Sequence, residues 1–144
     1  MCSIIGYSVN EIAAPIIVKG LKRMEYRGYD SVGVATESEN QIELKKGIGK
    51  VNEVNSKIQL DTLPGETGIG HTRWATHGKV TDLNAHPHPS NSGKIAIVHN
   101  GIVENFEELK KQLEDDGYNF KSETDSEIIA NLLQKNYEST KNVK

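Results

Sequence analysis

The sequence predicts a single domain of the α+β class, and three observations support this. The chain has 144 residues, a length at which one domain buries roughly 68–70% of its unfolded surface without disulfide or metal staples. Short apolar runs of strand length occur in both halves of the chain, while other apolar residues recur at helical spacing. No internal repeat, low-complexity segment or linker divides the chain, so we expect the strands and helices to share one domain.

The first strand is expected at Cys2–Ser8, because a short apolar run ended by polar residues is typical of a strand covered on both faces. A helix follows, with Asn10 as its cap and Pro15 tolerated in its first turn. This helix is expected to end near Tyr26. Gly20 in its interior weakens the helix by up to about 1 kcal/mol relative to alanine, which predicts close packing at that position.

Two strands and a short helix are predicted next. Asn40 is expected to turn the chain between the strands, and the second strand alternates apolar and polar residues, which indicates one exposed face. The strands are expected at 32–35 and 41–45, and the apolar face of the helix consists of Val51, Val54 and Ile58. The segment 63–65 is expected to end this helix.

A short strand leading to Arg73, a strand at Lys94–His99 and two helices are predicted for the rest of the chain. After Tyr137 the sequence has no core pattern and is expected to fray. The helices are defined by Phe106, Leu109 and Leu113 on the face of the first, by Gly117 at its end, and by Thr124 and Glu127 as a capping box before the second.

Composition and charge exclude several classes of function. There are 17 basic and 20 acidic residues, a net charge of -3, and no basic stripe with interleaved aromatics, so no nucleic-acid partner is expected. No apolar run approaches the ~18 residues of a membrane span, and no signal-peptide pattern is present. The single cysteine cannot form an internal disulfide, which fits a reducing compartment. We therefore expect a soluble cytoplasmic protein.

The only cysteine follows the initiator methionine, so removal of Met1 would give Cys2 both a thiol and a free α-amine. A thiol with a pKa of about 8.5 is a weak nucleophile at neutral pH unless a base lies beside it. An α-amine, with a pKa of about 7.7–8.0, is such a base. The alternative is that Cys2 is a small buried hydrophobic residue. Composition and spacing leave both interpretations open.

The densest group of candidate binding residues lies between Gly68 and Gly78. Arg73 is suited to gripping a carboxylate through two parallel hydrogen bonds, and Trp74 is suited to covering such a site. The alternative is a surface arginine beside a core tryptophan. Upstream, Arg27 is expected either to reach a charged group near the N-terminus or to belong to an ordinary connection in which Gly28 supplies a positive φ.

The histidines raise the possibility of a zinc or iron site. His86 and His88 are separated by one residue, and His71, His77 and His99 are further potential ligands. No carboxylate has the spacing of known metal-hydrolase motifs, and there is no second thiol. We therefore expect no metal and no other cofactor.

Two later segments have both a structural and a catalytic interpretation. Asn100-Gly101 is either a two-residue hairpin turn or a pair of donors, one amide and one backbone N–H, to a developing oxyanion. Losing one such donor typically costs ~10²- to 10³-fold in rate. Asp125 either stabilises the first turn of a helix or pairs with a substrate ammonium group.

Taken together, these motifs resemble the glutaminase domain of the glutamine:fructose-6-phosphate aminotransferase (glucosamine-6-phosphate synthase) family, a class II glutamine amidotransferase domain. The resemblance extends in order from Met1 to about Leu133. Amidophosphoribosyltransferases and asparagine synthetases share the N-terminal cysteine but differ in the arginine-tryptophan and tyrosine-arginine-glycine runs. The segments that carry the resemblance are Met1-Cys2, EYRGYDS at 25–31, HTRWATHG at 71–78, NAHPH at 84–88, VHNG at 98–101 and SETD at 122–125.

The resemblance implies an N-terminal-nucleophile hydrolase fold, a four-layer αββα sandwich of mainly antiparallel sheets. It implies that Cys2 attacks the side-chain amide of L-glutamine, forms a glutamyl thioester and releases ammonia. The other implied roles are Asn100 and Gly101 as the oxyanion hole, Arg73 for the α-carboxylate, Asp125 for the α-ammonium, Thr76 and His77 as pocket lining, Trp74 as lid and ammonia-channel residue, His86 in the adjoining site and Arg27 in fixing the N-terminal region.

In the full enzyme of that family, ammonia passes to a second domain that isomerises fructose 6-phosphate and aminates it to glucosamine 6-phosphate, and the enzyme is expected to be a homodimer. The present sequence departs from the family at Ser3, where a glycine is usual, so we expect crowding beside the nucleophile. Residues 1–144 are expected to form the glutaminase domain, incomplete at its C-terminal end and without the isomerase domain.

Three interpretations of function therefore compete. The first is the glutaminase part of the aminotransferase, with glutamine hydrolysis as its local chemistry. The second is a non-catalytic remnant that keeps the motifs without turnover. The third is a metal-dependent hydrolase built on the histidines. Ammonia release from glutamine distinguishes the first from the second, and sensitivity to a chelator would identify the third.

Overall fold

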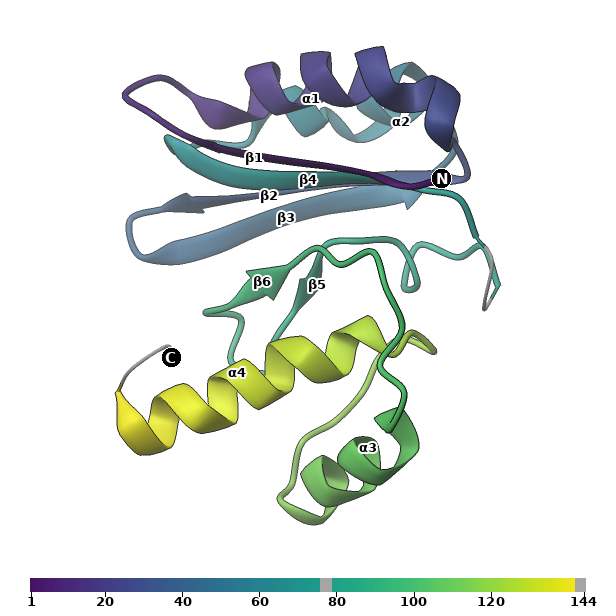
Figure 1. Cartoon of the computed structure of the whole chain (residues 1–144). Helices are drawn as coiled ribbons and strands as arrows, with labels where there is room; N and C mark the ends of the chain where they lie inside the picture. Colours follow the sequence, from purple (N-terminus) through teal and green to yellow (C-terminus); the bar gives the residue numbers. More distant parts are fainter. Residues whose placement is uncertain (76–78, 142–144) are drawn as a thin grey trace.

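The computed structural model describes residues 1–75 and 79–141 (Figure 1). The strands are β1 (Ser3–Ser8), β2 (Ser31–Ser38), β3 (Gln41–Ile48), β4 (Thr67–Arg73), β5 (His88–Pro89) and β6 (Ala96–Ile97). The helices are α1 (Ala13–Met24), α2 (Val51–Ile58), α3 (Phe106–Asp115) and α4 (Ser126–Thr140), with short 3-10 turns η1 (Glu25–Arg27) and η2 (Leu60–Thr62). None of the helices in these described ranges has the length and apolarity needed to cross a membrane.

The strands form a four-stranded sheet in the order β1-β4-β2-β3 and a separate pair, β5-β6. Each strand pairing among the described residues is antiparallel. Figure 1 shows α1 and α2 on one face of the large sheet, β5 and β6 on the opposite side, and α4 beyond them. This arrangement of helix, sheet, sheet and helix confirms the predicted α+β class and its four layers.

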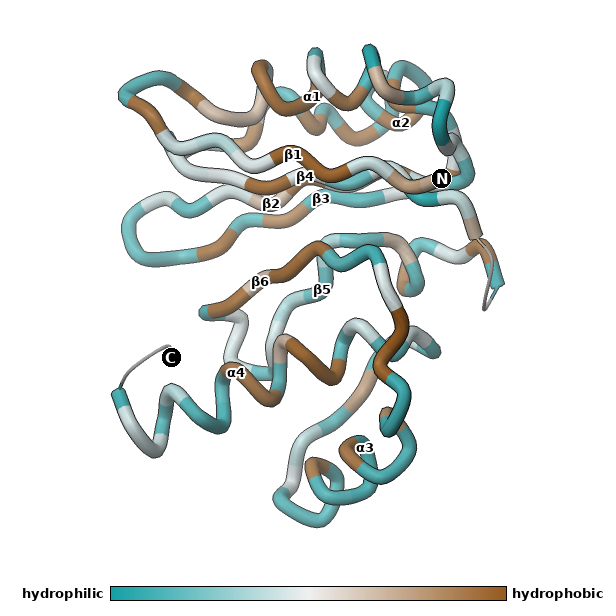
Figure 2. Tube along the Cα trace, in the orientation of Figure 1, coloured by the Kyte–Doolittle hydropathy of each residue, from teal (hydrophilic) through white to brown (hydrophobic). Residues whose placement is uncertain are grey.

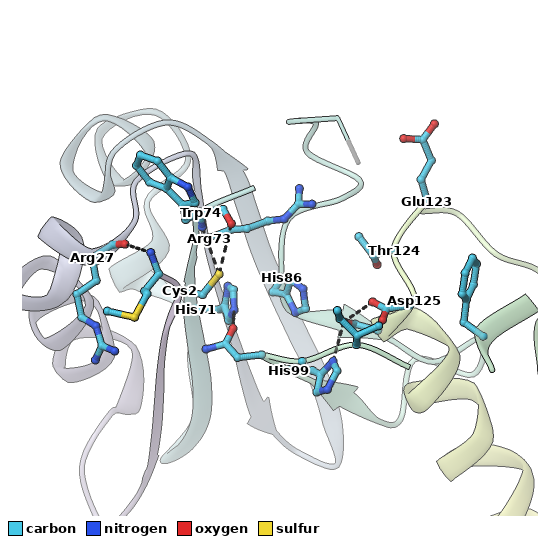
Figure 3. Close-up of a pocket in the computed structure, with 16 residues that line it drawn as sticks. Cys2, Arg27, His71, Arg73, Trp74, His86, His99, Glu123, Thr124 and Asp125 are labelled. Atoms are coloured by element: carbon cyan, nitrogen blue, oxygen red, sulfur yellow. Dashed lines mark hydrogen bonds between the residues drawn. The ribbon is translucent and has the colours of Figure 1, made fainter. Parts of the chain in front are cut away.

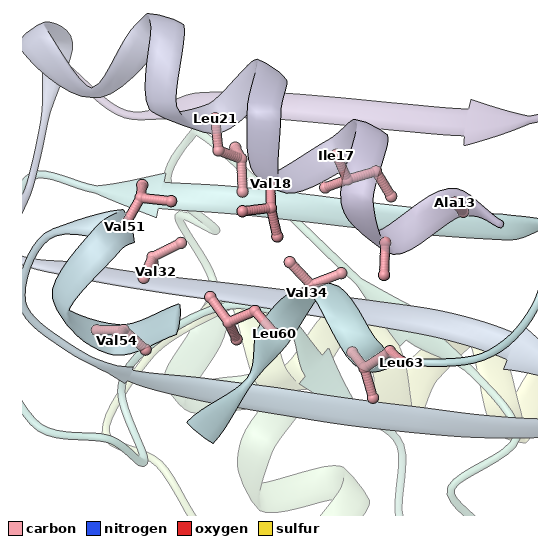
Figure 4. Packing of buried hydrophobic residues seen from close by; sticks show 11 residues of the cluster. Ala13, Ile17, Val18, Leu21, Val32, Val34, Val51, Val54, Leu60 and Leu63 are labelled. Carbon is pink, nitrogen blue, oxygen red and sulfur yellow. The ribbon is translucent and has the colours of Figure 1, made fainter. Parts of the chain in front are cut away.

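The main hydrophobic core lies between α1, α2 and the large sheet (Figure 4). Ile17 and Leu21 of α1 are fully buried and face Val32 and Val34 of β2. Burying a side chain of this size contributes about 1.5–3 kcal/mol. Gly70 of β4 leaves the space for α1, because a Cβ there would lie 2.4 Å from the Cγ2 of Ile17. In Figure 2, hydrophilic residues predominate along α3, an outer helix.

Two predictions about the N-terminal elements are wrong. Within the described part of the chain, β1 is an edge strand that pairs only with β4, and its residues alternate in burial, with Ile4 42% exposed. It is therefore not covered on both faces. The helix begins at Ala13 rather than beside Asn10, and the Ala13 N–H donates to the carbonyl oxygen of Gly65 over 2.9 Å. Close packing at Gly20 is confirmed, since a Cβ there would lie 2.4 Å from Ile5 Cδ1.

Two predictions in the C-terminal half also fail. The strand expected at Lys94–His99 is reduced to β6, which pairs with β5 only at His88–Ile97 and Pro89–Ala96, although the Ser90 N–H still donates to Ile95 O beyond this pair over 2.8 Å. The capping box is absent, because the Glu127 carboxylate instead accepts hydrogen bonds from Ser122 N–H over 2.7 Å and Ser122 Oγ over 2.7 Å. By contrast, α3 forms as predicted, and Gly117, with φ of 90°, follows it.

Candidate active site

The large sheet presents its candidate site residues on the face opposite α1. In β4, Gly70 meets α1, so His71 and Arg73 must point to the other face, because side chains alternate along a strand. Ser3 pairs with Thr72, and continuing this register brings Cys2 opposite Arg73. Antiparallel pairing therefore places the thiol and the guanidinium at one end of the sheet, on one face.

These residues line a pocket of about 700 Å³ (Figure 3). A volume of this size is in the usual range for small-molecule sites. In Figure 3, Cys2 and Arg73 lie toward the large sheet, and Thr124 and Asp125 lie across the pocket before α4. The lining residues are Met1, Cys2, Arg27, His71, Arg73, Trp74, His86, His99, Asn100, Gly101, Ile102, Phe106, Glu123, Thr124, Asp125 and Ser126.

Cys2 is half-buried, and its Sγ accepts a hydrogen bond from the backbone N–H of Trp74 over 3.3 Å. A donor aimed at the sulfur stabilises negative charge on it. The α-amine of Met1 donates to the carbonyl oxygen of Arg27. The neighbouring Ser3 is buried and its Oγ donates to Met24 O over 3.4 Å, so this departure from glycine is accommodated on the α1 side of the sheet, away from the thiol.

Gly28, between η1 and β2, does not have the positive φ that was predicted for it. Its φ is -179°, which is extended backbone, so it supplies no positive φ. Instead a Cβ at Gly28 would lie 2.7 Å from Met1 O and 3.1 Å from Trp74 Cβ. Glycine thus allows the N-terminus and the Trp74 segment to approach each other. Arg27 holds the N-terminal amine through its carbonyl oxygen rather than through its guanidinium.

Asn100 and Gly101 do not form a hairpin, since the chain continues from β6 through this segment toward α3. The Asn100 side-chain oxygen lies 2.8 Å from the Nε2 of His71. Gly101 lies against the ring of His99, where a Cβ would come within 2.6 Å of the His99 Nε2. His99 is in turn bonded through Nδ1 to Ser126 Oγ over 3.0 Å.

The alternative prediction, a surface arginine beside a core tryptophan, is wrong for both residues. Arg73 is only 7% exposed, and its Nη1 donates to Lys79 O over 3.3 Å. Trp74 is 44% exposed and meets the ring of Tyr29 edge-on, with 5.6 Å between ring centroids. The arginine is thus buried in the pocket wall, and the tryptophan lies at the surface beside it.

Asp125 lies at the start of α4 and in the pocket wall, and its pairing with a substrate ammonium group stays a prediction. Its Oδ2 accepts from the Val103 N–H over 2.6 Å, and its Oδ1 accepts from Ser126 Oγ over 3.3 Å. A carboxylate has about four acceptor positions, so these bonds leave capacity for a ligand. The contact with Val103 also ties the Asn100–Val103 segment to α4.

Three histidines form a buried row between the two sheets. The rings of His71 and His86 stack with centroids 4.3 Å apart, and His86 meets His88 at 4.4 Å, nearly edge-on. Burial lowers the pKa of His71 to about 4 and that of His88 to about 3, and also lowers the pKa of His86. All three are therefore neutral near pH 7. His88 also bonds Thr124 Oγ1 over 2.9 Å.

The histidine row gives no support to the metal-dependent interpretation. Across residues 1–75 and 79–141, no three His, Cys, Asp or Glu side chains are arranged to hold a metal ion. From the sequence, His71 and His88 were indicated only as potential metal ligands. The alternation of side chains along the strand that ends at Arg73 would have placed His71 on the same face as Arg73, and so in the site. The predicted pocket residues Thr76 and His77 lie outside the described residues.

Comparisons with known proteins agree with this geometry. Residues 58–142 match a family model described as a glutamine amidotransferase domain. Curated proteins named glutamine--fructose-6-phosphate aminotransferase [isomerizing] are 56% identical over 142 residues in Pyrococcus horikoshii and 53% identical over 143 residues in Methanococcus maripaludis. Each alignment covers 99% of this chain and 24% of the relative. The chain thus spans about a quarter of the length of these relatives.

Solved structures give a second, independent comparison. The glutamine phosphoribosylpyrophosphate amidotransferase of B. subtilis, complexed with ADP and GMP, matches with a TM-score of 0.77 and 31% identity. A structure described as the allosteric regulatory enzyme of purine biosynthesis matches with a TM-score of 0.79 and 31% identity. Each match covers 93% of this chain and 29% of the other.

Proposed function

Because the chain belongs to the glutamine amidotransferase domain family, we propose that its chemistry is hydrolysis of the side-chain amide of L-glutamine by the thiol of Cys2. One observation carries this proposal. The only cysteine of the chain shares a pocket with Arg73, Asn100 and Asp125, three polar residues from distant parts of the sequence. A nucleophile, an oxyanion donor and charges for both α-groups of an amino acid are what amide hydrolysis of glutamine requires.

In the proposed reaction, the Cys2 sulfur attacks the amide carbon and the carbonyl oxygen takes up negative charge. The Asn100 amide and the Gly101 N–H donate to this oxygen. The tetrahedral intermediate expels ammonia once the nitrogen has gained a proton, leaving a glutamyl thioester. Water then attacks the thioester, giving glutamate and the free thiol. Removal of Met1 would supply the Cys2 α-amine as the base that accepts the thiol proton and returns it to the leaving nitrogen.

Substrate specificity is assigned to two oppositely charged side chains. Arg73 binds the α-carboxylate of glutamine through its planar guanidinium, and Asp125 binds the α-ammonium. Thr76 and His77 are proposed to complete this part of the pocket. Trp74 is proposed to cover the bound substrate, with His86 and Arg27 supporting the site.

We also propose that the ammonia serves the aminotransferase reaction named for the curated relatives. In that reaction, a separate isomerase domain would convert fructose 6-phosphate to glucosamine 6-phosphate within a cytoplasmic homodimer. The identities of 56% and 53% to relatives of that name support this assignment. The proposal requires ammonia formed at Cys2 to leave past the exposed Trp74.

The test is glutamine-dependent release of ammonia and glutamate by the purified chain. We expect activity with L-glutamine, none with D-glutamine, and no loss on addition of a chelator. Cys2→Ala should abolish the activity, whereas Ser3→Gly, which removes a hydroxyl on the opposite face of β1, should retain it. A folded chain without activity would favour the non-catalytic remnant, and inhibition by a chelator would favour the metal-dependent hydrolase.

A further inference from the structure

We infer that His71 is a positioning residue for the oxyanion hole: its Nε2–H holds the side-chain oxygen of Asn100, so that the Asn100 amide nitrogen is left to donate to the substrate. The inference rests on the proposed function of Asn100. The two side chains are 2.8 Å apart between His71 Nε2 and Asn100 Oδ1. Because a primary amide is planar, fixing its oxygen also fixes the direction of its N–H bonds.

The direction of this hydrogen bond determines whether the site can work. If the His71 Nε2 donates, the Asn100 oxygen is occupied and its NH₂ remains available. If the Nε2 accepted instead, Asn100 would present a carbonyl oxygen to the developing oxyanion and would repel it. Only the first arrangement is compatible with Asn100 in an oxyanion hole.

The other ring nitrogen of His71 favours the first arrangement. His71 Nδ1 is buried and has no hydrogen-bond partner among residues 1–75 and 79–141. An Nδ1–H tautomer would leave a buried donor unpaired, which is rare in folded proteins. An Nε2–H tautomer leaves only a lone pair unpaired and uses the proton on Asn100. Burial lowers the pKa of His71 to about 4, so the ring is neutral and carries a single N–H near pH 7.

The surroundings of His71 fix the ring itself. His71 lies on β4 between two neighbouring strands, opposite Ile4 on one side and Gly33 on the other, and is 1% exposed. Its ring stacks on His86 with an interplanar angle of 22°. A group supported by a sheet and by a stacked ring is held more precisely than one on a loop. Asn100 is exposed and lies outside regular structure, so it depends on such a contact for its orientation.

The kinetic test compares His71→Phe, a ring without an N–H, with His71→Gln, whose amide can still donate. We expect His71→Phe to lower kcat for glutamine hydrolysis at least tenfold, with KM changed less than about twofold, and His71→Gln to recover part of the loss. In an Asn100→Ala background, His71→Phe should have no further effect on kcat. Full additivity of the two substitutions, or a rise in KM with kcat unchanged, would overturn the inference.

A second measurement does not depend on activity, so it separates this inference from the proposed function. Long-range ¹H–¹⁵N NMR spectra of the intact wild-type chain report which nitrogen of each imidazole is protonated. We expect His71 to be protonated at Nε2, with its Nε2 signal shifted in Asn100→Ala while the His88 signals stay in place. An Nδ1–H tautomer would contradict the inference, whether or not the chain hydrolyses glutamine.

Discussion

The backbone N–H of Trp74 points at the sulfur of Cys2 over 3.3 Å, and Asp30 holds the backbone on both sides of that N–H. The Asp30 N–H donates to Arg73 O over 2.9 Å, and its Oδ2 accepts from the Ala75 N–H over 2.6 Å. Asp30 therefore clamps the segment that supplies the donor to the thiol.

Removing this clamp should affect both stability and the reactivity of Cys2. Asp30→Ala should lower the free energy of unfolding by about 1–3 kcal/mol, because the Ala75 N–H loses its charged acceptor. It should also slow alkylation of Cys2 by iodoacetamide, because the backbone around the Trp74 N–H is then held on the Arg73 side only. Asp30→Asn keeps an oxygen acceptor and should lose less of each. Equal losses in the two variants would show that the acceptor is not what matters.

A second prediction concerns Gly33 of β2, which lies against the backbone of His86. A Cβ at Gly33 would lie 2.1 Å from the backbone oxygen of His86. Gly33→Ala must therefore push the histidine row away from the sheet, and we expect a cost of about 1–3 kcal/mol or more. Gly6→Ala is the matched control, since Gly6 is also in a strand and a Cβ there meets nothing within 4 Å. Urea unfolding of both variants measures the difference, and similar midpoints would contradict the packing described.

Lys46 of β3, the cross-strand neighbour of Gly33, also holds the segment that carries His86 and His88. Its Nζ donates to the carbonyl oxygens of Leu83, Ala85 and Pro87 over 3.1, 2.6 and 3.1 Å. Burial lowers the pKa of Lys46 to about 8, so the side chain is still mostly protonated at pH 7. Lys46→Met leaves these acceptors without their donor and should cost more than about 2 kcal/mol.

Lys45 is the control for this prediction. Its Nζ also donates to two oxygens, Gln59 O over 3.0 Å and Thr62 Oγ1 over 3.1 Å, but in an exposed setting. Lys45→Met should therefore cost less than about 1 kcal/mol, because water replaces the lost donor. Chemical unfolding of the two variants under identical conditions tests the comparison. Equal costs would mean that the three-carbonyl contact of Lys46 adds nothing to stability.

The buried histidines predict acid-sensitive stability. The folded-state pKa of His71 is lowered to about 4 and that of His88 to about 3, against about 6.5 in an unfolded chain. The unfolded state therefore binds more protons below pH 6.5, so stability is fully present above that pH and is lost as the pH falls toward 4. Each histidine contributes a slope of about 1 kcal/mol per pH unit between pH 5 and 6.

The pH prediction is checked by urea unfolding at intervals from pH 7.5 to pH 4.5. His71→Gln removes one titrating group. It should therefore reduce the fall in unfolding free energy between pH 5 and 6 by about 1 kcal/mol per pH unit. An unchanged slope in this variant would show that His71 is not held neutral in the folded state.

Local patterns predicted much of the fold because the residues concerned act within a few positions of one another. The helix with Val51 and Val54 on its buried face and the stop at Gly117 are confirmed examples, whereas Ile58, expected on the same face, is exposed. The edge position of β1 could not be predicted this way, since an apolar run has the same appearance in an edge strand and a central one. That difference depends on which strands become its neighbours.

The contacts within the site were harder to predict because they join distant segments. The motifs indicated Arg73, Asn100 and Asp125 one by one, but no local pattern shows that Asn100 meets His71 or that Asp125 accepts from Val103. The capping box failed for the same reason. Glu127 had partners available in Ser122 and Lys121, which local capping rules do not consider.

The central claim is that Cys2 is the nucleophile of an assembled glutaminase site. The most direct measurement is the intact mass of the folded chain before and after incubation with 6-diazo-5-oxo-norleucine, an electrophilic glutamine analogue. We predict loss of Met1 and one adduct, mapped to Cys2 and prevented by excess L-glutamine. A chain whose Cys2 reacts with iodoacetamide but gains no adduct from the analogue would contradict the claim.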